Sequence, residues 1–170
     1  MTRPPTTGLR CIIAGGRNIR EYAIVEAAIE ASGFVIAQVV SGVAEGVDRL
    51  GEQWGYAHDV PIARFPANWD RYGKRAGILR NGEMAAYAQA LVAVWDGRSP
   101  GTKNMIAQAH AHDLYISVYR ADCVLCGAIH RKDRTCQGAV VDWAARKARA
   151  LAYTYTNRHG VHSPEYQDYD

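Results

Sequence analysis

The chain has 170 residues, of which 48% are hydrophobic and 22% are charged, and its formal net charge at pH 7 is +3. This composition is typical of a globular domain with one sizeable core and excludes a disordered, fibrous or membrane-embedded protein. Its apolar runs are far shorter than the roughly 20 residues of a membrane span, and residues 1–10 lack the apolar segment of a secretory signal. We therefore expect a cytoplasmic protein with no membrane partner.

Short apolar segments alternate with amphipathic segments along most of the chain. The apolar segments predict five strands, at residues 9–14, 34–40, 59–65, 90–95 and 114–119. The segments between them predict helices at residues 21–31, 46–58, 77–88 and 102–112. Because strands that alternate with helices form right-handed βαβ units, the expected fold is α/β, a doubly wound Rossmann-like parallel sheet covered on both faces.

This pattern divides the chain into three parts. Residues 1–8 are expected to be a flexible lead-in, and residues 9–120 the α/β domain. Residues 121–170 are expected to form a small Cys-rich appendage, with a helix over residues 139–152 and a polar tail. In a doubly wound fold, ligands bind outside the carboxyl ends of the strands, so the loops at those ends are the place to look for a site.

Polar loops with glycines follow the first, second and fourth predicted strands. Glycine lets the backbone approach a ligand closely, and the N-terminus of a following helix attracts anions. Each loop alone is equally well explained as a turn or a helix cap, but three of them at one sheet edge indicate a site for a phosphorylated ligand. The residues predicted to bind it are Gly15, Gly16, Arg17 and Asn18, then Ser41, Gly42, Gly46 and Asp48, and finally Asp96, Gly97, Ser99, Gly101 and Thr102.

Arg80 and Asn81, near the start of the third predicted helix, are a further candidate element. A fixed guanidinium there can clamp a phosphate through two parallel hydrogen bonds, and the alternative is a solvated helix face. Residues 68–73 predict a long polar loop whose aromatic side chains either stack on a base or pack on the protein. None of these segments has the order of a P-loop or of a dinucleotide fingerprint.

Four motifs in this order resemble the YspA/YpsA-related branch of the SLOG superfamily. They are Ile13-Ala14-Gly15-Gly16-Arg17, Ser41-Gly42-x3-Gly46-Val47-Asp48, Arg80-Asn81-x2-Met84 and Trp95-Asp96-Gly97-x-Ser99-x-Gly101-Thr102-x2-Met105. The resemblance covers about residues 9–119 and implies a pocket, lined by these loops, for a nucleotide or nucleotide-derived ligand. We expect an ADP-ribose-like molecule or a nucleoside monophosphate, bound by a sensor or sequestering protein that requires no cofactor and forms a homo-oligomer.

The same superfamily holds the Lonely Guy phosphoribohydrolases, which cleave the N-glycosidic bond of nucleoside monophosphates. Their motifs carry two glutamates, and here Leu79 and Met105 stand at those positions. Glycosidic cleavage needs a carboxylate to stabilise the transition state or to activate water. The residues therefore favour binding, and the enzyme remains an alternative in which Asp48, Glu83 or Asp96 substitutes.

The superfamily also holds the Rossmann-like domain of the DNA-processing protein Smf/DprA, which implies single-stranded DNA binding as a second alternative. Basic groups at Arg71, Lys74 and Arg75 lie in the sequence beside Trp69 and Tyr72, and single-strand binders combine such charges with stacking aromatics. The small net charge argues against this alternative.

The appendage contains a cluster of soft metal ligands. A structural zinc site takes four such side chains, and the alternative in a chain without a secretory signal is a set of reduced, unliganded thiols. The predicted ligands are Cys123, Cys126, His130 and Cys136. His159 or His162 is an alternative fourth ligand.

Overall fold

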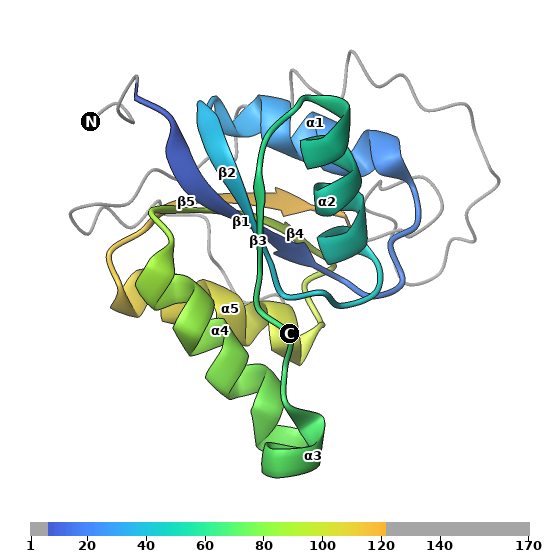
Figure 1. Ribbon diagram of the computed structural model, residues 1–170. Coiled ribbons are helices and arrows are strands. Elements are labelled where there is room, and N and C mark those ends of the chain that lie inside the picture. The colour runs from blue at the N-terminus through green and yellow to red at the C-terminus, as the bar shows by residue number, and fades with distance from the viewer. Residues whose placement is uncertain (1–6, 122–170) are drawn as a thin grey trace, which may run out of the picture.

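The computed structural model describes residues 7–121, and these form a five-stranded sheet with helices on both faces (Figure 1). The order across the sheet is β3-β2-β1-β4-β5, and every adjacent pair is parallel. The predicted α/β parallel sheet is thus confirmed, whereas the predicted appendage lies outside the described residues. The strands are β1 (Leu9–Gly15), β2 (Ile36–Ser41), β3 (Ile62–Arg64), β4 (Ala90–Trp95) and β5 (Tyr115–Arg120).

Helices cover both faces of the sheet (Figure 1). On one face lie α1 (Tyr22–Ser32) and α2 (Val47–Ala57), and on the other lie α4 (Ala76–Tyr87) and α5 (Pro100–Ala111). Across residues 7–121, no helix combines the length and the hydropathy needed to cross a membrane.

The core has two apolar layers, one on each face, and successive residues of the central strands alternate between them. In β1, Cys11 and Ile13 lie in the layer under α1 and α2, whereas Ile12 and Ala14 lie in the layer under α4 and α5. Because both faces are covered, the strand sequence is continuously apolar. Burial raises the pKa of the Cys11 thiol to about 12, which makes it an inert core side chain.

The prediction of a polar loop over residues 68–73 is wrong. A one-turn helix, α3 (Trp69–Tyr72), is followed by a 3-10 turn (Gly73–Arg75) that runs directly into α4. The side chain of Asn68 caps α3, because its Oδ1 accepts a hydrogen bond of 3.0 Å from the backbone N–H of Arg71. The aromatic residues of this segment therefore belong to a helical turn, and α3 lies at the N-terminal end of α4 (Figure 1).

The strand order places a topological switch between β1 and β4. The chain winds from β1 outward through β2 to β3, and then returns across the sheet to β4 and β5. Ligands of doubly wound folds bind at the carboxyl ends of the strands beside such a switch. The loops that follow β1, β2, β3 and β4 all lie at this edge.

Candidate functional site

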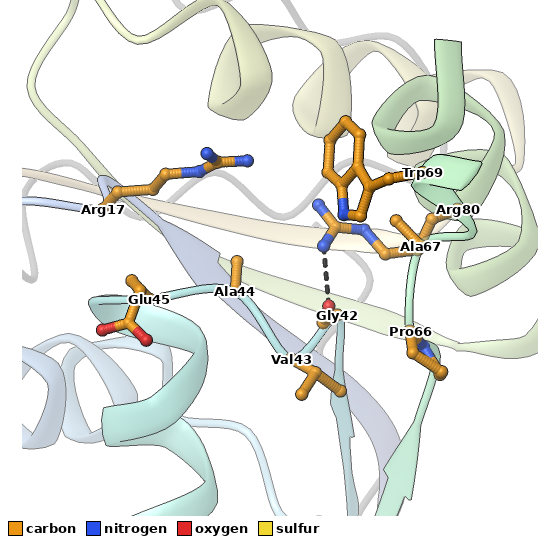
Figure 2. Close-up of a pocket in the computed structure, with 9 residues that line it drawn as sticks. All are labelled: Arg17, Gly42, Val43, Ala44, Glu45, Pro66, Ala67, Trp69 and Arg80. Atoms are coloured by element: carbon orange, nitrogen blue, oxygen red, sulfur yellow. Dashed lines mark hydrogen bonds between the residues drawn. The ribbon is translucent and has the colours of Figure 1, made fainter. Parts of the chain in front are cut away.

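A cavity of about 260 Å³ opens at the carboxyl ends of β1, β2 and β3 (Figure 2). Its walls come from the loops after these three strands and from α3 and α4. The lining residues are Arg17 from the first loop, residues 42–45 from the second, Pro66 and Ala67 from the third, Trp69 from α3 and Arg80 from α4.

Arg80 links α4 to the loop after β2. Its Nη1 donates a hydrogen bond of 2.6 Å to the carbonyl oxygen of Gly42, and its Nη2 donates one of 3.3 Å to Oδ1 of Asn81. A guanidinium has five N–H donors, and these bonds use two of them. Its Nε is buried and has no hydrogen-bond partner among residues 7–121. Arg80 is thus a fixed cation that retains donors for an anionic ligand.

The ends of the Arg80 and Asp48 side chains crowd position 42. A Cβ at this position would lie 2.8 Å from Cζ and Nη1 of Arg80 and 2.8 Å from Oδ2 of Asp48. Real Cβ contacts are essentially never that short, so a side chain here would displace the guanidinium. The carbonyl oxygen of Gly42 therefore helps to hold Arg80 in the cavity wall.

Asp48 lies behind this loop, with only 3% of its surface exposed. Its Oδ2 accepts a hydrogen bond of 3.3 Å from the backbone N–H of Ala44. Burial raises the pKa of Asp48 to about 6, although the positive charge of Arg80 and backbone hydrogen bonds act in the opposite direction. Asp48 lies in the first turn of α2, as the sequence predicts. In addition, its carboxylate compensates part of the positive charge of Arg80.

Arg17 brings a second guanidinium to the same cavity. Figure 2 shows its side chain reaching over the loop of residues 42–45 toward Trp69, and its Cζ lies 6.0 Å from the centroid of the Trp69 ring. Burial lowers the pKa of Arg80, and the charge of Arg17 lowers it further, so the two cations repel each other. An anion bound between them would relieve this repulsion.

The loops after β1 and β2 are joined at Gly46. Gly46 has a φ of +79°, and a Cβ there would lie 2.4 Å from the carbonyl oxygen of Gly16. Beside it, the backbone N–H of Val47 donates to that same oxygen at 3.4 Å. The first two predicted loops therefore form one contiguous wall.

The loop after β4 does not line the cavity. Its Asp96 side chain accepts hydrogen bonds from the backbone N–H groups of Arg98 and Ser99, at 2.9 and 2.7 Å. The hydroxyl of Thr102, which is 3% exposed, donates to Oγ of Ser99 at 3.1 Å. Asn81 connects this loop to the site, because its Nδ2 donates to the carbonyl oxygen of Gly101 at 3.3 Å.

Ser41 is fully buried beneath the second loop and is engaged within the protein. Its hydroxyl donates to Oε1 of Glu52 at 2.8 Å and accepts from the backbone N–H of Val43 at 3.1 Å. Arg64 binds the other Glu52 oxygen at 3.0 and 2.7 Å. Although burial opposes it, these hydrogen bonds lower the pKa of Glu52. The geometry places Ser41 in a buried polar network that anchors the loop.

The structure brings together only part of the predicted site. Arg17, Gly42 and Arg80 line the cavity, while Gly15, Gly16, Gly46 and Asp48 support its walls. Asn18, like the loop after β4, does not line it. The prediction missed the loop after β3, whose Pro66 and Ala67 are on the same sheet edge. The rule that carboxyl ends of parallel strands meet at one edge would have identified that loop.

The predicted zinc ligands Cys123, Cys126, His130 and Cys136 lie outside the described residues. Within residues 7–121, no group of three or more His, Cys, Asp or Glu side chains is arranged to hold a metal ion. The charged side chains that line the candidate site are Arg17, Arg80 and Glu45, and its aromatic side chain is Trp69.

Comparison with known proteins agrees with the motifs. Residues 9–72 match the model of the YspA, cpYpsA-related SLOG family, which confirms the predicted resemblance over a segment that includes the loops after β1, β2 and β3. The chain is also 36% identical over 77 residues to the "Gene 61 protein" of Mycobacterium phage D29, a stretch covering 42% of this chain and 62% of that protein. No solved structure shows a significant match.

Proposed function

We propose that this chain, which resembles the SLOG family over residues 9–72, binds a nucleotide or nucleotide-derived ligand as a sensor or sequestering protein. The observation that carries the proposal is the pair of guanidiniums in one cavity, with Arg80 seated on the carbonyl oxygen of Gly42. Guanidiniums favour phosphate because their planar N–H pairs match its oxygen atoms. The position of the cavity, at the carboxyl ends of parallel strands, agrees with this ligand class.

The charge of the cavity also favours an anion. Glu45 is the carboxylate among its lining residues, and its Oε2 pairs with Nη1 of Arg20 at 3.0 Å. Asp48 is buried behind the wall and does not line the cavity. The surface that a ligand meets is therefore positively charged around Arg17 and Arg80.

Lonely Guy enzymes carry glutamate at two positions where this chain has Leu79 and Met105, and these two residues favour binding over cleavage. Met105 is 1% exposed and packs in the core layer under α4 and α5, so this position serves the core. Leu79 is partly exposed on α4 and does not line the cavity. Asp96 accepts two backbone hydrogen bonds, and Glu83 is exposed on α4 away from the cavity lining.

A second candidate function is the binding of single-stranded nucleic acid, and one observation favours it. The segment from α3 through the 3-10 turn exposes Trp69 and Tyr72 together with Arg71, Lys74 and Arg75. Aromatics interleaved with cations bind single strands by stacking and by contacts to phosphates. Such binding would weaken steeply as the salt concentration rises. This salt dependence distinguishes it from the binding of one small ligand.

Native mass spectrometry of the full chain tests the proposal. We expect the isolated protein, or the protein incubated with nucleoside monophosphates and ADP-ribose, to retain one nucleotide-class mass per chain. Liquid chromatography of the same mixtures should show no free base. Release of free base would establish the enzyme, and salt-sensitive retention of an oligonucleotide with no mononucleotide binding would establish the second candidate.

A further inference from the structure

We infer that Arg17 and Trp69 form a stacking slot for a nucleobase, and that the ligand is a single nucleoside monophosphate whose phosphate lies toward Arg80. The inference rests on the proposed function, because it assigns parts of one ligand to parts of the same cavity. The slot joins two segments that are far apart in the chain, the loop after β1 and α3.

The spacing of the two side chains is close to the spacing that a flat ring between them needs. Cζ of Arg17 lies 6.0 Å from the centroid of the Trp69 ring. A ring between them needs about 7 Å, since carbon atoms in contact are about 3.5 Å apart. The slot therefore has to open by about 1 Å. Both side chains are exposed, with Trp69 at 48%, so neither is locked in a packed core.

The position of Trp69 is nevertheless restricted by its place in α3 and by its contact with α4. Its backbone belongs to α3, which Asn68 caps, and its Cη2 lies 3.4 Å from where a Cβ of Gly77 would be. The missing side chain at Gly77 lets the indole lie close to the first turn of α4. The ring is thus supported near its Cη2 atom and lines the cavity.

The chemistry of the two partners favours a base over another planar group. Bases stack on aromatic rings and on guanidinium planes alike, and this slot offers one of each. Arg80 lines the same cavity from α4, and its guanidinium suits an anionic oxygen. Base and phosphate therefore have separate anchors.

The volume of the cavity favours a small ligand. Pockets for drug-sized ligands are about 300–1,000 Å³, and this cavity of about 260 Å³ lies just below that range. It suits one nucleoside monophosphate better than a ligand with a second ribose and phosphate. Of the two ligands expected from the sequence, the geometry favours the smaller.

Calorimetric titration of AMP and of ribose 5-phosphate into the full chain tests this inference. We expect Trp69→Ala to weaken AMP binding about 10-fold or more, as loss of one stacking contact does, and to leave the affinity for ribose 5-phosphate unchanged. Trp69→Phe should restore most of the affinity for AMP. Arg17→Lys, which keeps the charge but loses the plane, should also weaken AMP selectively.

The outcomes separate the slot from the proposed function. Tyr72→Ala is the matched control, because Tyr72 is a partly exposed aromatic of the same short helix that does not line the cavity, and it should bind AMP like the wild type. Equal AMP affinity for wild type and Trp69→Ala would overturn the slot while leaving the proposed function intact. An ADP-ribose affinity about tenfold above that of AMP would overturn the mononucleotide assignment, and a wild type that binds none of these compounds would contradict the proposed function itself.

Discussion

Arg80 on α4 donates a 2.6 Å hydrogen bond to the carbonyl oxygen of Gly42, which lies 38 residues earlier in the loop after β2. The bond exists because position 42 has no side chain, since a Cβ there would overlap the guanidinium. It places a cation at the cavity wall and leaves its buried Nε without a partner among residues 7–121. The relationship between these two residues is the structural basis of the proposed anion site.

Gly42→Ala should abolish or severely weaken nucleotide binding, because the added Cβ displaces Arg80 from its seat. Calorimetric titration with AMP measures this effect. The matched control is Gly82→Ala, at another glycine of the described chain, where a Cβ in α4 meets nothing closer than 3.7 Å. That control should bind normally and gain about 0.5–1 kcal/mol in stability from its better helix propensity. Wild-type affinity in Gly42→Ala would show that the position of Arg80 does not matter for binding.

Ser41→Ala should reduce stability more than it reduces binding. The substitution leaves the buried carboxylate of Glu52 and the backbone N–H of Val43 each without the hydroxyl partner, and such losses cost about 1–3 kcal/mol. Urea denaturation measures the stability, and titration with AMP measures the affinity. If the affinity falls more than about tenfold while the midpoint of unfolding stays in place, Ser41 is a ligand contact and not an anchor of the loop.

Gly46→Ala should destabilise the fold by more than Gly33→Ala. Both glycines have positive φ, +79° and +65°, but a Cβ at Gly33 would have no atom within 4 Å, whereas a Cβ at Gly46 would lie 2.4 Å from the carbonyl oxygen of Gly16. Backbone strain alone costs about 1–2 kcal/mol, and this should account for the whole effect at Gly33. Urea denaturation of both variants measures the difference, to which the clash and the more strained backbone of Gly46 (ψ −124° against 14° at Gly33) both contribute. Equal losses would show that the two loops are not locked together at Gly46.

Asp48→Asn should change how stability depends on pH. Burial raises the pKa of Asp48 from 3.8 to about 6, so the folded state holds this proton more tightly than the unfolded state does. The stability of the wild type relative to the variant should therefore be highest below about pH 4 and fall as the pH rises toward about 6. The slope cannot exceed about 1.4 kcal/mol per pH unit.

Urea denaturation of both proteins from about pH 4 to about pH 7 measures this difference. Arg80 and Glu52 are the charged groups that also act on Asp48. Above about pH 6 the difference should level off, because the carboxyl is ionised in both states. A difference in stability that is constant over this whole range would contradict the buried, proton-retaining environment of Asp48.

The fold is predictable because its core is regular. Strands buried on both faces require continuous apolar runs, and residues 90–95 form such a run and become β4. The prediction fails at α3 because one helical turn is too short to show a periodic pattern. The available signal is Asn68, a favourable N-cap residue directly before the turn.

The site is predictable only in part because its contacts are long-range. Loop chemistry identifies Gly42 and Arg80 separately, but no local pattern shows that one accepts a hydrogen bond from the other. The sequence places Asp48 in a first helical turn, whereas its burial depends on how the loop folds over it. Pro66 and Ala67 carry no distinctive chemistry, so their place in the cavity wall follows from topology alone.

The most direct test of nucleotide binding at this cavity is calorimetric titration of AMP, GMP, CMP and UMP into the full chain and into Arg80→Ala and Arg80→Lys. We expect saturable binding of at least one of them at one site per chain. We also expect loss of that binding in Arg80→Ala and weakening by about tenfold or more in Arg80→Lys, which keeps the charge without the planar donors. Absence of saturable binding to the wild type, or equal affinity in all three proteins, would contradict nucleotide binding at Arg80.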